Sequence, residues 1–396
     1  MSLWVSALVL IGAAMAQTDP RLSALHATLV DLRAQTKLSN DNRGDSPELT
    51  IAKHQLRAWI ESQLGSIAKE GDEQEVSQRM NEELRKVSLE LADDNENGLG
   101  SLGPTTLKWD SELLILTTRV GILCGQDASA YAYRKVDGKW RRIWDSEQYD
   151  YGHDQPQRLA AVHVLQSHEG GNKIGPVYIM TLGNKSGCSS AWHPVYYRIW
   201  RVDSVGPKLL LERSEMAWRR TETFLVGSIA QGTDGVVDAL IEFTEKSVDN
   251  GVHNREAIRH FKIEGDRVKR VGPVALSPRD FVDEWLTRPW SESANWSYSA
   301  SLRASHQRIH SDYVAGYFIS PTMHCETPDL WQVDFENIDE KQPQDSNANV
   351  YFLIRWTPPY RFTMMNVSNK TWPKCNQPDE EADAWRTLFS TQDWRN

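Results

Sequence analysis

The pattern that most restricts the fold is a hairpin signal that occurs three times between residues 112 and 276. In each copy, two runs rich in aromatic and β-branched residues flank a short turn. The turns lie at Asp137-Gly138, at residues 203–207 and at Gly265-Asp266, about sixty residues apart. Such turns between such runs are typical of β-hairpins, and a regular period indicates one supersecondary unit that is repeated.

Each hairpin can be extended to a unit of four strands. The second unit is the clearest, with strand-like runs beginning at Leu159, Pro176, Pro194 and Lys208. Strands joined by short turns pair antiparallel, and meanders in series build either propeller-like rings or open stacked sheets. Three units are too few to close an ordinary ring. We therefore expect a mainly β fold of serial four-stranded antiparallel meanders, propeller-like or stacked as open sheets.

A helical region precedes the repeats. Leu22, Leu25, Leu29 and Leu32 recur at helical spacing, which predicts one apolar stripe. The segment 46–48, Ser-Pro-Glu, is typical of a helix start, and a third periodic segment follows Gly71. These stripes predict a helical core, although a dimerising helical arm would carry the same pattern.

The chain divides into five predicted parts. We expect a signal peptide over residues 1–16, a helical region over 17–93, a linker over 94–104, the repeated β-meander domain over 105–276 and a small α+β C-terminal domain over 277–396. In the last part, Ser277-Pro278 is typical of a helix start, and three strand-like runs begin at Leu330, Val350 and Arg361. We expect residues from Cys375 onward to form a tail.

The N-terminus predicts export. An apolar run over residues 3–11 is followed by Ala14-Met15-Ala16 and the polar Gln17, as at a signal peptide cleavage site. The usual positive residues before the apolar run are missing, so a buried helix or a membrane anchor is the alternative. No second apolar run approaches membrane length. We therefore expect a secreted or periplasmic protein without stable membrane insertion after signal removal.

Four cysteines, an even number, suit an oxidising compartment. They are Cys124, Cys188, Cys325 and Cys375, and three pairings are open. We prefer Cys124 with Cys188 and Cys325 with Cys375, since each pair then lies within one predicted domain. None of them forms a C-x-x-C motif, which argues against a redox or zinc site.

Composition narrows the partners. A net charge of −10 argues against nucleic acid, because binding to phosphates needs an excess of Lys and Arg. The chain has 16 tryptophans, a residue that stacks on sugar rings and peptide side chains when exposed and fills sheet interfaces when buried. Core packing is the better interpretation of most of them. A protein or glycan ligand remains the expected kind of partner.

Local motifs predict no metal or cofactor. The chain lacks a nucleophile elbow, a glycine-rich phosphate loop and an H-E-x-x-H motif. His306 and His310 are four residues apart, and Asp312 and His324 are further conceivable metal ligands. Arginines beside the two histidines would oppose a cation, so a solvated helix face is the better interpretation.

One loop between the first two units is polar and rich in aromatic residues. It contains Tyr149, Asp150, Tyr151, His153 and Asp154, which are candidates for contact with a ligand. Loops at the ends of meanders often carry function, and the carboxylates and histidine suit acid–base chemistry. A plain surface turn is the competing interpretation.

The sequence is compatible with two main classes of function. The first is an exported, non-catalytic β-repeat protein that binds a ligand or gives structural support. The alternative is a secreted hydrolase, with glycans as one candidate substrate class, whose carboxylates meet only in the fold. Glu147, Asp150 and Asp154 are the candidates. A third idea, docking of the N-terminal helices on another chain, needs a partner that the sequence does not identify.

Overall fold

The computed structural model forms two compact units, residues 1–158 and 159–396, and each is considered by itself. The predicted domain boundaries remain a prediction. The structure describes residues 19–38, 46–67, 72–89, 98–109, 112–122, 125–147, 157–169, 173–185, 192–218, 230–231, 237–246, 254–272, 274–275, 277–312, 316–337, 349–358 and 360–379. None of the described helices is both long and apolar enough to cross a membrane.

The first unit begins with the three predicted helices. They are α1 (Pro20–Leu38), α2 (Pro47–Ile67) and α3 (Glu73–Arg85). The α3 helix begins where the side chain of Asp72 accepts a hydrogen bond from the backbone N–H of Gln74, at 2.9 Å, which satisfies one of the unpaired donors of the first turn. The predicted helical N-terminal region is thus confirmed.

The first meander follows as a four-stranded antiparallel sheet. Its strands pair in the order β1-β2-β3-β4. They span Thr106–Trp109 (β1), Leu113–Ile122 (β2), Gly125–Val136 (β3) and Lys139–Asp145 (β4). The predicted hairpin turn joins β3 to β4, and φ is 50° at Asp137 and 72° at Gly138, the positive angles that favour Asp-Gly in tight hairpins.

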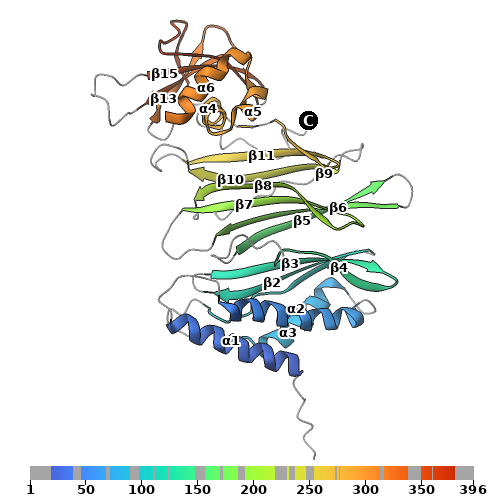
Figure 1. The fold of residues 1–396 in the computed structure, drawn as a ribbon. Helices are drawn as coiled ribbons and strands as arrows, with labels where there is room; N and C mark the ends of the chain where they lie inside the picture. Colours follow the sequence, from blue (N-terminus) through green and yellow to red (C-terminus); the bar gives the residue numbers. More distant parts are fainter. Residues whose placement is uncertain are drawn as a thin grey trace, which may run out of the picture. The chain divides into compact units, whose positions relative to one another are not determined.

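The three helices lie on one face of this sheet (Figure 1). Alternation along the strands supplies the apolar face, because side chains two residues apart point to the same side. The shared core includes Leu25 and Leu29 of α1, Leu56 and Ile60 of α2, Met80 of α3, and Leu114 and Leu116 of β2. Burying one leucine of this kind contributes about 1.5 to 3 kcal/mol.

The β2 strand runs through Gly121 without a break. The structure has a single strand from Leu113 to Ile122. A Cβ atom at Gly121 would lie 1.9 Å from the carbonyl oxygen of Gly98, so only glycine permits this close approach. The described part of the predicted linker is thereby held against β2 by the hydrogen bond from the Gly121 N–H to Ser101 O, at 2.7 Å.

The second and third meanders share one eight-stranded sheet in the second unit. Its order is β12-β11-β10-β8-β7-β6-β5, and β9 also pairs with β10. The strands are β5 (Gln157–Glu169), β6 (Lys173–Lys185), β7 (Trp192–Val202), β8 (Pro207–Trp218), β9 (Ala230–Gln231), β10 (Val237–Lys246), β11 (Asn254–Glu264) and β12 (Arg267–Arg270). Between β8 and β10, the register contains one pair, Ala217 with Glu245.

The β11–β12 hairpin folds back onto the second meander. The rings of Tyr197 and Phe261 lie 5.9 Å apart, and the Tyr178 hydroxyl donates to Gly265 O at 3.3 Å. Asp266 accepts from Arg201 at 2.5 Å and from Lys208 at 2.6 Å, and these hydrogen bonds, Lys208 first, lower its pKa. The β11–β12 hairpin therefore packs against β6, β7 and β8, and Figure 1 shows β10 next to β8 in the shared sheet.

This arrangement confirms the predicted fold class. The protein is mainly β, with antiparallel meanders in series after a helical N-terminus. Among the described strands, the eight-stranded sheet does not close into a barrel, since β5 and β12 end it without pairing to each other.

The C-terminal part begins with a group of short helices. They are α4 (Pro278–Thr287), α5 (Trp290–Ser293) and α6 (Arg303–Asp312), with 3₁₀ turns at Ala294–Trp296 and Ala300–Leu302. The predicted start of α4 is confirmed, because the Ser277 hydroxyl accepts from the backbone N–H of Asp280 at 3.1 Å and Pro278 is the first helical residue.

A five-stranded antiparallel sheet completes the second unit, in the order β16-β15-β14-β13-β17. The strands are β13 (Gly316–Cys325), β14 (Leu330–Asn337), β15 (Asn349–Thr357), β16 (Arg361–Ser368) and β17 (Cys375–Pro378). The sequence predicted β14, β15 and β16 but missed β13, whose pairing with β14 is interrupted between Ile319 and Met323. The predicted tail is wrong for residues 375–378, which pair with β13.

The α4 helix packs on one face of this sheet. Phe281 and Trp285 have no exposed surface, and Trp285 lies edge-on to Phe352 of β15, with ring centroids 6.3 Å apart. Val333 and Phe335 of β14, Ile354 of β15 and Met364 of β16 complete the core. Strand alternation places these residues on one face.

A disulfide joins Cys325 of β13 to Cys375 of β17, as the preferred pairing predicts. Both residues are buried. The other preferred pair, Cys124 with Cys188, lies outside the described residues.

Removing this disulfide should weaken the C-terminal sheet. Because it closes a loop over a sequence separation of 50 residues, we expect replacement of both cysteines by serine to cost about 2 to 4 kcal/mol of unfolding free energy. Urea unfolding of the variant and of the oxidised wild type measures the difference. Coincident unfolding curves would contradict a stabilising role.

Candidate functional site

A polar stripe on α2 faces the first sheet. Lys53, Arg57 and Glu61 are spaced by four residues and so lie on one side of the helix. Each contacts a charged group on or beside β3 or β4. The stripe therefore lies inside the unit, between helix and sheet.

Glu147, a sequence candidate for acid–base chemistry, contacts the middle residue of this stripe. Its carboxylate accepts hydrogen bonds from the hydroxyl of Tyr131 on β3 and from Arg57 on α2. The Glu147 side chain is only 8% exposed. Burial, reinforced by the Glu147 charge, raises the pKa of Tyr131 well above its ordinary value, so this phenol stays protonated and acts as a donor.

His54 is the solvent-exposed residue in the group around Glu147. Its Nε2 lies 3.6 Å from a Glu147 carboxylate oxygen, and its side chain is 54% exposed. A carboxylate beside a histidine can orient the imidazole. The pair of His54 with Glu147, next to the stripe, is therefore the arrangement that suits acid–base chemistry best.

A second, similar group surrounds Glu61. The Tyr133 hydroxyl donates to Glu61 at 3.0 Å, and Arg142 of β4 donates to the same oxygen at 2.9 Å. Arg142 also lies 3.2 Å from the buried Asp145. Burial and then the Glu61 charge raise the pKa of Tyr133, which keeps this hydroxyl a donor as well.

The most buried contact of the stripe is an ion pair. Lys53 Nζ lies 2.9 Å from an Asp127 carboxylate oxygen, and the two side chains are 9% and 3% exposed. Removing either charge alone would leave the other desolvated, which is strongly unfavourable. The pair therefore fixes where α2 sits on the sheet.

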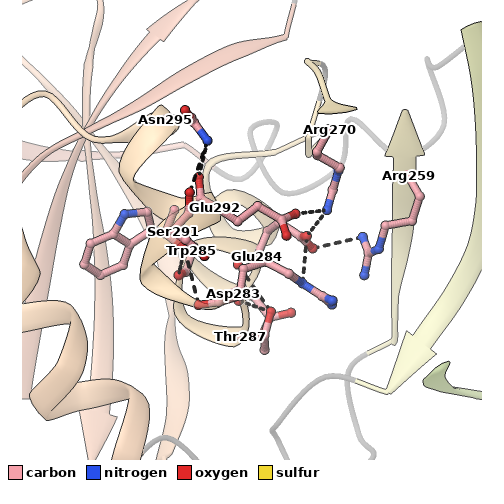
Figure 2. A network of polar contacts seen from close by, with 11 residues as sticks. Arg259, Arg270, Asp283, Glu284, Trp285, Thr287, Ser291, Glu292 and Asn295 are labelled. Carbon is pink, nitrogen blue, oxygen red and sulfur yellow. Dashed lines mark hydrogen bonds and ion pairs between the residues drawn. The ribbon is translucent and has the colours of Figure 1, made fainter. Parts of the chain in front are cut away.

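The second unit contains a larger charge cluster around Glu284 of α4 (Figure 2). The side chain of Glu284 has no exposed surface. Its oxygens lie 3.0 Å from Arg259 Nη1 of β11, 2.8 Å from Arg270 Nη1 of β12 and 3.1 Å from Arg288 Nε. The guanidinium of Arg259 is likewise fully buried.

Glu292 supplies a second carboxylate to this cluster. Arg270 Nη1 donates to it at 2.9 Å, and the guanidinium of Arg270 lies over the ring of Trp296, 5.4 Å from its centroid. The cluster joins the β11–β12 hairpin to α4. Because no solvent reaches Glu284, we interpret its ion pairs as structural contacts. They hold the β11–β12 hairpin to α4, and we call this arrangement a clamp.

The predicted ligand-contact loop stays a prediction. Tyr149, Asp150, Tyr151, His153 and Asp154 all lie outside the described residues. Before this loop, the described chain ends at Glu147, which accepts hydrogen bonds from Arg57 and Tyr131.

Of the four conceivable metal ligands, His310 and Asp312 have side chains outside the described residues. The preferred interpretation of a solvated helix face is wrong for His306. His306 is buried, with Nε2 2.9 Å from Trp285 O and its ring edge-on to the rings of Trp285 and Trp290. His324 lies on β13 against Trp331. Across the described residues, no three His, Cys, Asp or Glu side chains are grouped to hold a metal ion.

Most tryptophans whose surroundings are described serve packing. Trp59, Trp144, Trp200, Trp285, Trp296 and Trp331 are buried. Core packing, the better sequence interpretation, therefore holds for these residues.

The C-terminal sheet has one carboxyl group with a shifted pKa. Asp334 of β14 is half-buried, and burial raises its pKa, while the hydrogen bond from Gln332 at 2.7 Å acts in the opposite direction. A raised carboxyl pKa destabilises the folded state at neutral pH, and this effect disappears as the pH falls through the folded pKa.

We expect Asp334→Asn to raise the melting temperature slightly at neutral pH. The difference from wild type should shrink on acidification, because both side chains are then neutral. Thermal unfolding over a pH series measures it. A constant difference at every pH would contradict the titration of Asp334 as its cause.

Comparison with known proteins identifies no family. No family model matches the chain, and no curated protein matches it. Among solved structures, a BT0996 RGII complex has a TM-score of 0.26 at 9% identity, over 66% of this chain and 72% of that one. A glycoside hydrolase has a TM-score of 0.26 at 8% identity, over 74% of this chain and 93% of that one. The alpha-L-arabinofuranosidase from Lactobacillus brevis has 0.23 at 8%, over 72% and 82%. Such scores support no argument about fold or activity.

Proposed function

We propose that the protein is exported to a secreted or periplasmic location and acts there as a non-catalytic β-repeat protein that binds a protein or glycan ligand. The observation that supports this most is the use of the charged groups. In the described part of the chain, one cluster surrounds a carboxylate with no exposed surface, held by three arginines. A general acid or base must reach its substrate, and a clamp of this kind cannot.

The α2 stripe supports the same proposal. Glu61 and Glu147 each bind one tyrosine and one arginine, and the ion pair of Lys53 with Asp127 is buried. These contacts join helix to sheet and stiffen a scaffold. A rigid scaffold suits a protein that presents a surface to a ligand.

A secreted hydrolase is the second candidate, and one observation favours it. The His54–Glu147 pair, at 3.6 Å, combines a carboxylate with an exposed imidazole beside the start of the predicted ligand-contact loop. This geometry would let His54 accept a proton from a water molecule while Glu147 stabilises the imidazolium.

Measuring product formation distinguishes a binding protein from a hydrolase. The chain from Gln17 onward would be incubated with panels of oligosaccharides, esters and peptides, and the same panels would be screened for binding. We expect saturable binding without product formation. Product formation that Glu147→Gln or His54→Gln abolishes, in variants with wild-type melting temperatures, would replace the binding proposal with hydrolysis. The matched control is Glu264→Gln, which removes an exposed carboxylate far from α2 in sequence.

A further inference from the structure

The tip of the β3–β4 hairpin carries an excess of positive charge on a chain whose net charge is −10. Five of the nine residues from Arg134 to Arg142 are basic, and Asp137 is the one acid among them. Opposite the side that packs on the helices, Arg134 of β3 stands directly across from Arg141 of β4, and Val136 from Lys139. Directly opposed residues share a face, so three cations gather there.

This arrangement is unfavourable without an anion. Like charges directly opposite each other on a sheet are destabilising. Among the described residues, neither Arg134 nor Lys139 has a hydrogen bond or ion pair through its side chain, and Arg134 Nη2 is buried without an acceptor. Arg141 lies 3.9 Å from Asp137, whose side chain is 88% exposed, so this contact is weak.

The backbone beside these charges is also open for pairing. The β4 strand is the last strand of its sheet, and in the described part of the chain it pairs only with β3. Charged side chains often protect such edges from aggregation. Edge protection accounts for Lys139, but it does not account for two opposed arginines of which one lacks an acceptor.

We propose that the β3–β4 hairpin binds an acidic peptide segment, which pairs in extended form with the edge of β4 and places alternate carboxylates against Arg134, Lys139 and Arg141. An extended peptide has side chains of one face at every second residue, which matches Lys139 and Arg141. Main-chain hydrogen bonds would supply affinity, and the cations would select acidic side chains. The inference rests on the proposed binding function and names a partner class for it.

A synthetic peptide in which Glu and Thr alternate tests this site on the full chain from Gln17 onward. We expect saturable binding by fluorescence anisotropy that weakens as salt is added, and a loss of affinity of at least about tenfold in the double variant Arg134→Gln/Arg141→Gln. The variant Lys108→Gln/Arg119→Gln is the matched control, because it removes two exposed charges from the same sheet away from the hairpin. It should bind as wild type does.

Several outcomes would overturn the inference. They are absence of saturable binding, equal binding of a peptide with Gln in place of Glu, and equal binding by the Arg134→Gln/Arg141→Gln variant with an unchanged melting temperature. Tighter binding of an oligogalacturonate than of the peptide would assign the hairpin to acidic glycans and overturn the peptide assignment. None of these results concerns turnover, so they leave the proposed function to its own experiment.

Discussion

Replacing Glu284 by glutamine is expected to lower the free energy of unfolding by about 3 to 5 kcal/mol, the usual cost of breaking a buried ion pair from one side. The substitution keeps the size of the side chain and removes its charge. Arg259 then keeps its positive charge in a fully buried position without the Glu284 carboxylate, and Arg270 and Arg288 lose the same partner. Urea unfolding followed by tryptophan fluorescence measures the change.

A matched control separates burial from charge. Glu264 pairs with Lys262 at 3.0 Å, and the two side chains are 58% and 43% exposed. We expect Glu264→Gln to change stability by less than about 1 kcal/mol, because exposed pairs are screened by solvent. A similar effect of both substitutions would show that the Glu284 cluster is not desolvated and would remove the basis of the clamp.

Turn chemistry explains why the hairpins were predictable. Asp137-Gly138 and Gly265-Asp266 lie in positions where Gly138 and Gly265 have positive φ, a local property that the residue types reveal. The start of α4 was predictable for the same kind of reason, since Ser277 and Pro278 act within one helical turn. Local signals of this kind give strands and helix starts.

The joining of the meanders was not predictable. One register pair, Ala217 with Glu245, links β8 to β10, and neither residue type marks that contact. The β13 strand was missed because its pairing with β14 shifts between Ile319 and Met323, which interrupts the alternation on which strand prediction depends. These features depend on residues that are far apart in the chain.

The charge clusters could not be predicted from the polar residues of the helices. Lys53, Arg57 and Glu61 follow one side of α2, and such a stripe usually faces water. In α4, Phe281, Val282, Trp285 and Leu286 lie on one side of the helix, and no local pattern indicated that Glu284 is buried as well. The local sequence also did not indicate which arginines would pair with Glu284.

Replacing Lys53 by methionine is expected to cost about 3 to 5 kcal/mol of unfolding free energy, because the Asp127 carboxylate, 3% exposed, would stay buried without the ammonium group that lies 2.9 Å from it. Methionine keeps most of the length of the side chain, so the loss measures charge more than packing. The exposed pair of Lys86 with Glu83, with side chains 63% and 45% exposed, provides the control. Lys86→Met should cost less than about 1 kcal/mol.

The double variant Lys53→Met/Asp127→Leu gives the decisive comparison for this pair. Because two well-packed apolar side chains need no desolvation of charge, we expect the double variant to be close to wild type in stability and well above Lys53→Met alone. Such recovery would show that the cost of the single substitution arises from an uncompensated buried charge on β3. If the double variant were less stable than either single variant, Lys53 and Asp127 would each be needed for contacts beyond their ion pair, and α2 would be held on the sheet by the wider polar stripe.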